Sequence, residues 1–244
     1  MFVFGSGVLI GTPQGGTPIN FGLAQEVSLA IATSTKALFG QYDFPIAIGS
    51  GTRKMTGKAK LARVSGQALG ALFFGVAPSP GSVQTQFGKA TAVPASAPYA
   101  YTPLHHADFV ADQGVVYAAT ALPLKQVAAD PAAGQYSLAG GVYTFAAADA
   151  GAAALVSYTY AVAASGQSVA VDAQLIGPSV TFSANLFAAD PTTGKPFSLL
   201  LYNCVADKLA LGTKLEDFMI PELDFSCFAN AAGQVCQLNF GDAA

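Results

Sequence analysis

Few residues of this chain could perform acid–base or metal chemistry, and the densest group of them is His105, His106 and Asp108. Imidazole nitrogens and a carboxylate can bind a transition metal or move a proton near neutral pH. Adjacent residues of an extended chain point to opposite sides, however, and no other histidine exists to complete a site. We therefore expect these residues to lie on a loop surface, without a catalytic or metal-binding role.

Glycines near a lysine could instead cradle a phosphate group. Residues 51–59 are similar to a phosphate-binding loop, but one residue too many separates Gly51 from Gly57, and Ala59 stands where Ser or Thr is needed. The glycines of residues 5–11 lack the spacing of a dinucleotide-binding turn, and the Gly-x-Ser-x-Gly pattern of serine hydrolases is absent. The sequence predicts neither a cofactor nor an enzymatic activity.

The chain contains three cysteines, Cys204, Cys227 and Cys236. Their spacing is not that of metal ligands, and an odd number argues against the disulfide framework of a small secreted protein. We expect them to be buried as small apolar side chains.

The composition indicates a surface that water does not fully cover. Hydrophobic residues make up 52% of the chain and charged residues only 10%, whereas about 25% is usual for charged residues. The apolar runs are too often interrupted for a membrane-spanning helix, and residues 1–10 lack the basic start of a signal peptide, so we expect a cytoplasmic origin. These features favour a subunit that buries large faces against copies of itself.

The few charges are distributed unevenly. Five of the eleven basic residues fall within residues 53–63, on what reads as a strand with a basic outer face, and the densest acidic segment lies near the C-terminus. We predict that the two groups meet across a subunit boundary, although two solvated faces that never touch remain an alternative. The candidate contact residues are Lys54, Lys58, Lys60, Glu216, Asp217, Glu222 and Asp224.

Local periodicity predicts the elements that would position these residues. Alternation of apolar and polar residues predicts strands at residues 26–33, 44–48 and 54–62. Ser65 precedes a helical pattern that ends before Gly75, which predicts one short amphipathic helix.

The middle of the chain differs in composition and in the length of its predicted strands. Prolines in residues 77–103 predict an extended linker. Short β-like runs follow at 115–118, 135–138, 142–145 and 153–160, with a hairpin turn at 139–141, and longer strands at 168–176, 179–187, 197–205 and 234–240. We expect a main domain of residues 1–100 and 164–244, interrupted by a small β-module at residues 101–163. Residues 108–160 of this module are expected to be a peripheral elaboration.

Several segments together resemble the tail tube proteins of long-tailed bacteriophages, and the resemblance covers essentially the whole chain. The resembling segments are QYDFPIAI (41–48), GTRKMTGKAK (51–60), LFFG (72–75), GVYTF (141–145), DAG (149–151), SYTY (157–160), KLEDFMIP (214–221) and DFS (224–226). None of them is a catalytic motif.

This resemblance implies a mainly β tail tube fold: two packed antiparallel sheets, a β-sandwich or barrel, flanked by one helix. It also implies a non-enzymatic structural subunit that forms stacked, typically hexameric rings around a channel for DNA. The implied partners are further copies of the chain, a tape measure protein, and tail terminator and tip proteins. DNA would pass through the channel without specific binding, and the protein would be assembled in the host cytoplasm and reside in the virion tail. Lysines that project into this channel are a less favoured alternative to the subunit contact, because cations there would bind phosphates.

Three other functions remain open at this point. A tube subunit of a contractile secretion machine would have the same fold and composition. A monomeric carbohydrate-binding module is suggested by tyrosines that could stack on sugars. A hydrolase using His105 or His106 is the least supported. The tyrosines are Tyr117, Tyr136, Tyr143, Tyr158 and Tyr160.

Overall fold

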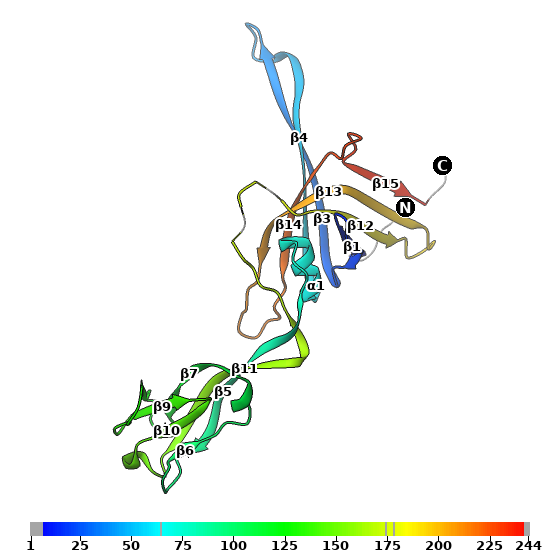
Figure 1. Ribbon diagram of the computed structural model, residues 1–244. Coiled ribbons are helices and arrows are strands. Elements are labelled where there is room, and N and C mark those ends of the chain that lie inside the picture. The colour runs from blue at the N-terminus through cyan, green and yellow to red at the C-terminus, as the bar shows by residue number, and fades with distance from the viewer. Residues whose placement is uncertain (1–6, 64, 174, 178, 242–244) are drawn as a thin grey trace. The chain divides into compact units, whose positions relative to one another are not determined.

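The computed structural model describes residues 7–63, 65–173, 175–177 and 179–241 (Figure 1). Strands make up 58% of the chain and helices 6%, so the predicted mainly β class with several antiparallel sheets is confirmed. The chain divides into two compact units. Unit 1 comprises Met1–Pro78 and Val169–Ala244, and unit 2 comprises Ser79–Ser168. Unit 2 is therefore inserted in the sequence between two parts of unit 1.

Unit 1 contains one eight-stranded antiparallel sheet with the order β2-β1-β12-β13-β14-β4-β3, in which β15 pairs with the first part of β13. Its strands are β1 (Val8–Pro13), β2 (Ile19–Asn20), β3 (Leu23–Phe39), β4 (Pro45–Arg63), β12 (Thr181–Ala189), β13 (Pro196–Ala210), β14 (Glu222–Phe228) and β15 (Cys236–Phe240). The predicted strand at 26–33 lies within β3, and those at 44–48 and 54–62 belong to the single strand β4.

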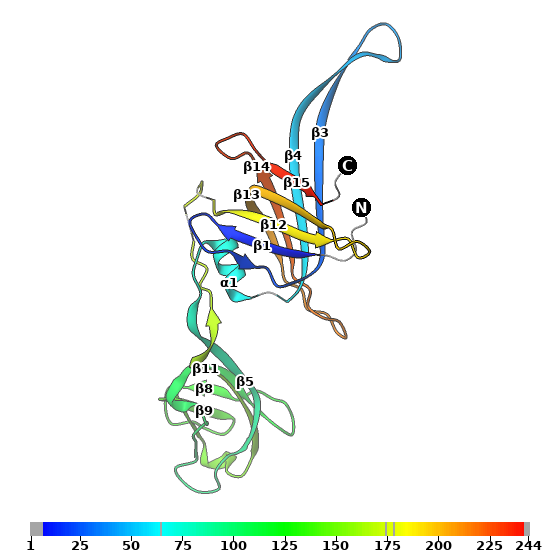
Figure 2. The ribbon, with the colours of Figure 1, turned by 90° about the vertical axis from the view of Figure 1, so that its right-hand side faces the viewer.

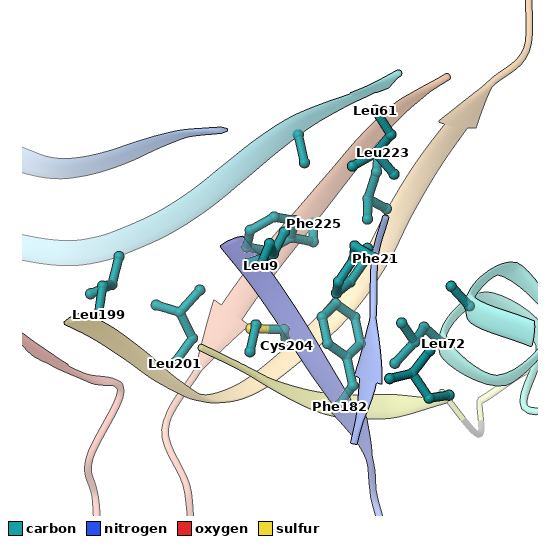
Figure 3. Close-up of a cluster of buried hydrophobic side chains, with 14 of the residues drawn as sticks. Leu9, Phe21, Leu61, Leu72, Phe182, Leu199, Leu201, Cys204, Leu223 and Phe225 are labelled. Carbon is teal, nitrogen blue, oxygen red and sulfur yellow. The ribbon is translucent and has the colours of Figure 1, made fainter. Parts of the chain in front are cut away.

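The core of unit 1 lies inside this sheet, which curls around it. Phe182 of β12 and Phe225 of β14 have ring centroids 6.1 Å apart although β13 lies between their strands. Figure 3 shows side chains from β1, β12, β4 and β14 converging on one cluster. The described strands of unit 1 thus form one curled sheet, in place of the two packed sheets that were expected. The large buried side chains are Leu9, Phe21, Leu61, Leu72, Phe182, Leu199, Leu201, Leu223 and Phe225.

The predicted helix is confirmed, but its second turn is π-helical, which the sequence does not predict. The Ser65 hydroxyl accepts a hydrogen bond of 3.1 Å from the N–H of Ala68 and begins α1 (Gly66–Leu69). The chain then widens into the π-helical turn η1 (Gly70–Phe74), which ends at Gly75 with a φ of 64°. This turn directs Leu72 into the core.

One strand prediction for unit 1 is wrong, and the strands β1, β2 and β14 have no predicted counterpart. Residues 168–176 alternate like a strand, but the described residues between Val169 and Ile176 pair with no strand, and Val171 and Ile176 are exposed. Here the alternation does not correspond to a buried face. The strand β14 has no counterpart among the predicted elements, although it pairs with both β13 and β4.

Unit 2 contains two small sheets around a second core. A three-stranded sheet has the order β5-β11-β7 and a four-stranded sheet the order β6-β10-β9-β8. Short 3-10 turns span His106–Asp108 and Ala147–Asp149. The strands are β5 (Ser79–Ala92), β6 (Ala100–Tyr101), β7 (Phe109–Tyr117), β8 (Lys125–Val127), β9 (Gln135–Ala139), β10 (Val142–Phe145) and β11 (Ala153–Ser168).

The short β-runs and the hairpin predicted for this region are confirmed. β9 and β10 pair in antiparallel register around Gly140 and Gly141. Their φ values are 55° and 76°, which glycine adopts without strain in a two-residue hairpin turn.

The predicted linker at residues 77–103 is wrong over its first half, which forms β5. The prolines of the segment fall at its two ends, and residues 82–92 between them contain none and pair along β11. The insertion therefore begins at Ser79, ahead of the predicted residue 101. A cut limited to residues 108–160 would remove β7 and the first half of β11, leaving residues 84–92 of β5 without a partner strand.

Excision of unit 2 between Pro78 and Val169 is expected to leave unit 1 folded. Ser79 and Ser168 are paired neighbours on β5 and β11, so a linker of a few Gly and Ser residues spans the gap. The two cores also share no residue. Circular dichroism of the excised chain should show a cooperative β-type melting transition. A chain lacking only residues 108–160 is the matched comparison and should melt less cooperatively; loss of folding in the first variant alone would contradict the division.

Candidate functional site

The hairpin formed by β3 and β4 extends past the other strands of unit 1 (Figures 1 and 2). β3 and β4 pair along nearly their whole lengths, from Leu23 with Arg63 to Phe39 with Pro45. β14 joins β4 only at residues 55–60. Residues 32–54 are therefore a two-stranded ribbon to which no third described strand is added. We call this segment the hairpin arm.

The hairpin arm carries large apolar side chains that water surrounds. Phe44 is 78% exposed, Tyr42 73% and Ile46 70%. A two-stranded hairpin without a packed face is marginally stable, and contiguous exposed apolar surface marks an interaction site. β3 also forms an edge of the sheet, whose backbone groups are open to pairing. The apolar set on the arm and at its base is Ile31, Leu38, Phe39, Tyr42, Phe44, Ile46 and Ile48.

Below the arm, the outer face of β4 is charged, as the sequence predicts. Met55 and Leu61 point into the core, while Lys58 and Lys60 alternate onto the outer face. Lys58 Nζ lies 2.8 Å from a carboxylate oxygen of Glu222 on β14, and Lys60 Nζ lies 2.6 Å from Glu26 on β3. The hydrogen bond with Glu222 raises the pKa of Lys58, and the same bond lowers the pKa of Glu222.

These ion pairs join residues of one chain, and the predicted contact across a subunit boundary stays a prediction. Lys58 and Lys60 already have acidic partners within the chain, because β14 and β3 flank β4 in the sheet. Asp224 lies opposite Lys58 in the register of β14 and β4. The sequence could not show the pair of Lys58 with Glu222, because β4 and β14 are far apart along the chain.

The other candidate contact residues do not take part in these two ion pairs. Lys54 is exposed on the hairpin arm, and Glu216 and Asp217 are exposed in the loop between β13 and β14. These three residues remain candidates for a contact with another molecule.

Charge reversal should separate the two kinds of contact. Lys58→Glu places two carboxylates side by side, and we expect Tm to fall by no more than about 3 °C, since the pair is largely solvated. Adding Glu222→Lys should restore Tm, whereas Glu216→Lys with Asp217→Lys should not. The difference should shrink as pH falls through the lowered pKa of Glu222, where its carboxylate becomes protonated. Rescue by the Glu216 and Asp217 changes alone would contradict the pairing within the chain.

The histidines are engaged in structural contacts in unit 2. The ring of His105 stacks on Tyr160, with centroids 3.9 Å apart and planes 4° from parallel. His106 Nδ1 lies 3.1 Å from the carbonyl oxygen of Pro103. Across the part of the chain that the structure describes, no three His, Cys, Asp or Glu side chains are grouped so as to hold a metal ion.

The tyrosines proposed as sugar-stacking faces are mostly buried, which corrects that interpretation. Tyr136, Tyr143 and Tyr158 lie in the core of unit 2. The hydroxyls of Tyr136 and Tyr143 donate to the carboxylate of Asp112, and burial together with this carboxylate raises the pKa of both tyrosines. The stack with His105 involves the ring of Tyr160. Sequence periodicity gave no sign of this carboxylate-centred packing.

The segment that is similar to a phosphate-binding loop is part of β4, and its residues 55–60 are paired on both sides. Its backbone N–H groups are therefore not arranged as a cradle. In the described part of the chain, no helix has the length and apolar character needed to span a membrane. No protein-family model matches the sequence, and no curated protein matches it.

Proposed function

We propose that this chain is the self-assembling subunit of a bacteriophage tail tube, which forms stacked, hexameric rings around a channel for DNA. The observation that carries the proposal is the hairpin arm, whose apolar side chains are exposed on both faces of a two-stranded ribbon. Such a ribbon gains stability when another copy covers it. The low fraction of charged residues, 10%, fits a surface that is largely buried on assembly.

The resemblance to tail tube proteins supports the same proposal, and two of its segments carry exposed apolar residues. The segment at residues 41–48 covers the tip of the arm. The segment at residues 214–221 includes Leu215 and Phe218, which are 93% and 88% exposed. In the proposed assembly, one of these apolar segments would contact a subunit of the same ring and the other a subunit of the next ring.

The charge distribution suits a DNA channel. The net charge is −3, and Lys58 and Lys60 are neutralised by acidic residues of the same chain. Unpaired cations on the channel wall would bind phosphates and retard DNA. As a tube subunit in the virion tail, the protein would contact a tape measure protein inside the tube and terminator and tip proteins at its ends.

Electron microscopy of the purified chain, with light scattering across concentration, tests the proposal. We expect annular particles with an open centre that stack into tubes as concentration rises. A chain that stays monomeric at millimolar concentration would overturn the proposal. A tape measure gene beside the coding sequence would separate a phage tube from the tube of a contractile secretion machine.

A further inference from the structure

Two of the three cysteines lie side by side at the centre of the unit 1 sheet. Cys204 of β13 is directly opposite Cys227 of β14 in the antiparallel register, and their Sγ atoms are 3.5 Å apart. Both are free thiols. Directly opposed residues have Cα atoms about 4.5–5.5 Å apart, within the range of about 4.4–6.8 Å that a disulfide needs. A bond between the two sulfurs therefore requires no rearrangement of the strands.

The two thiols differ in access and in acidity. Cys204 is fully buried, and Figure 3 shows it within the core cluster, whereas Cys227 is half-buried. The hydrogen bond from Cys204 lowers the pKa of Cys227, while this bond and burial raise the pKa of Cys204. A thiolate is the reactive form of cysteine. Cys227 is thus the group placed to react first with a dissolved reagent.

We propose that Cys204 and Cys227 are a thiol–disulfide exchange site that takes a small-molecule disulfide, such as oxidised glutathione, and forms an intramolecular bond. The thiolate of Cys227 attacks one sulfur of the reagent, and the other sulfur leaves as a thiolate. Cys204 then attacks Sγ of Cys227, and its proton passes to the second glutathione sulfur, which leaves as a thiol. In sum the protein loses two protons and two electrons, and the reagent is reduced to two thiols.

The bond would fasten two central strands of the sheet. The two cysteines are 23 positions apart, and the chain between them includes the exposed apolar loop around Leu215 and Phe218. Closing a loop of this length restricts the unfolded chain, and we expect Tm of unit 1 to rise by roughly 5–10 °C. The inference needs only unit 1 and stands whether or not the chain forms tubes. In a released virion, which rests on the proposed function, the bond would form after exit from the reducing cell interior.

Peptide mapping of the native full chain after incubation with oxidised glutathione tests the proposal. The wild type should yield a peptide pair linked through Cys204 and Cys227, with the Tm increase reversed by dithiothreitol. Cys204→Ala should stop at a glutathione adduct on Cys227, and Cys227→Ala should form neither product. Cys236→Ala is the matched control, since Cys236 pairs in register with Leu201 on β13, and it should form the bond like the wild type.

Two results would overturn the proposal. One is a native wild-type chain that reacts at Cys236 or not at all while the Cys204–Cys227 link stays absent. The other is a link that forms only after unfolding in urea. Both are read from the wild type, so the proposal remains testable even if Cys204→Ala fails to fold.

Discussion

Serine at both Phe44 and Ile46 is expected to abolish assembly while leaving the subunit folded. These side chains are 78% and 70% exposed on the hairpin arm, so the isolated chain loses no core contact when they are removed. Burial of one such side chain contributes about 1.5–3 kcal/mol. Removing two from each contact should weaken association at least about 100-fold.

Sedimentation and electron microscopy measure this loss, and circular dichroism checks the fold. Phe87→Ser is the matched control, because Phe87 is a comparably exposed aromatic residue in unit 2, at 84%. The control should assemble like the wild type. Equal assembly of the Phe44 and Ile46 variant and the wild type would show that the arm makes no essential contact. An equal loss in both variants would show that exposed aromatic residues in general drive association.

Local patterns in the sequence are sufficient to predict much of unit 1. The alternation of Met55 and Leu61 with Lys58 and Lys60 gives the strand and the side of each residue, because one face of β4 is buried there. The Ser65 cap likewise marks the start of the helix, because its hydroxyl satisfies a backbone N–H in the first turn. Each of these signals is contained within a few residues.

The hairpin arm and the ion pairs could not be predicted in the same way. The pattern around Phe44 and Ile46 is that of an ordinary half-buried strand, and only the absence of a third strand leaves these residues in water. The pairing of Lys58 with Glu222 depends on which strands become neighbours. Strand order arises from packing of the whole unit, which no local period encodes.

The linker prediction for the proline-rich residues 77–103 failed for a related reason. Pro78 precedes β5, Pro80 is the second residue of this strand, and Pro94 follows the strand. Proline is excluded from the interior of a sheet but is tolerated at strand ends, so its positions carry more information than its frequency.

The glycine at position 57 illustrates a long-range constraint whose removal should have a large effect on stability. The sequence places Gly57 on the buried face of β4 but gives no reason for glycine there. In the structure, a Cβ atom at Gly57 would lie well inside van der Waals contact of the Phe225 ring, which is buried and packed against Phe182. The Phe225 ring thus occupies the space that a side chain at position 57 would need.

Gly57→Ala is therefore expected to destabilise unit 1 by about 1–3 kcal/mol through overpacking, and Phe225→Ala by about 3–5 kcal/mol through the cavity it leaves. In the double variant the alanine methyl group enters the vacated space, so the two costs should fall short of additivity by about 1–3 kcal/mol. Gly49→Ala on the same strand is the matched control, because a Cβ there meets only the Lys36 carbonyl oxygen at 4.0 Å. Urea unfolding is followed by circular dichroism at a concentration where the chain is unassembled. It gives the change in unfolding free energy of each of the four variants relative to the wild type. Additive costs, or a Gly49→Ala variant as unstable as Gly57→Ala, would mean that the Phe225 ring is not what requires glycine at position 57.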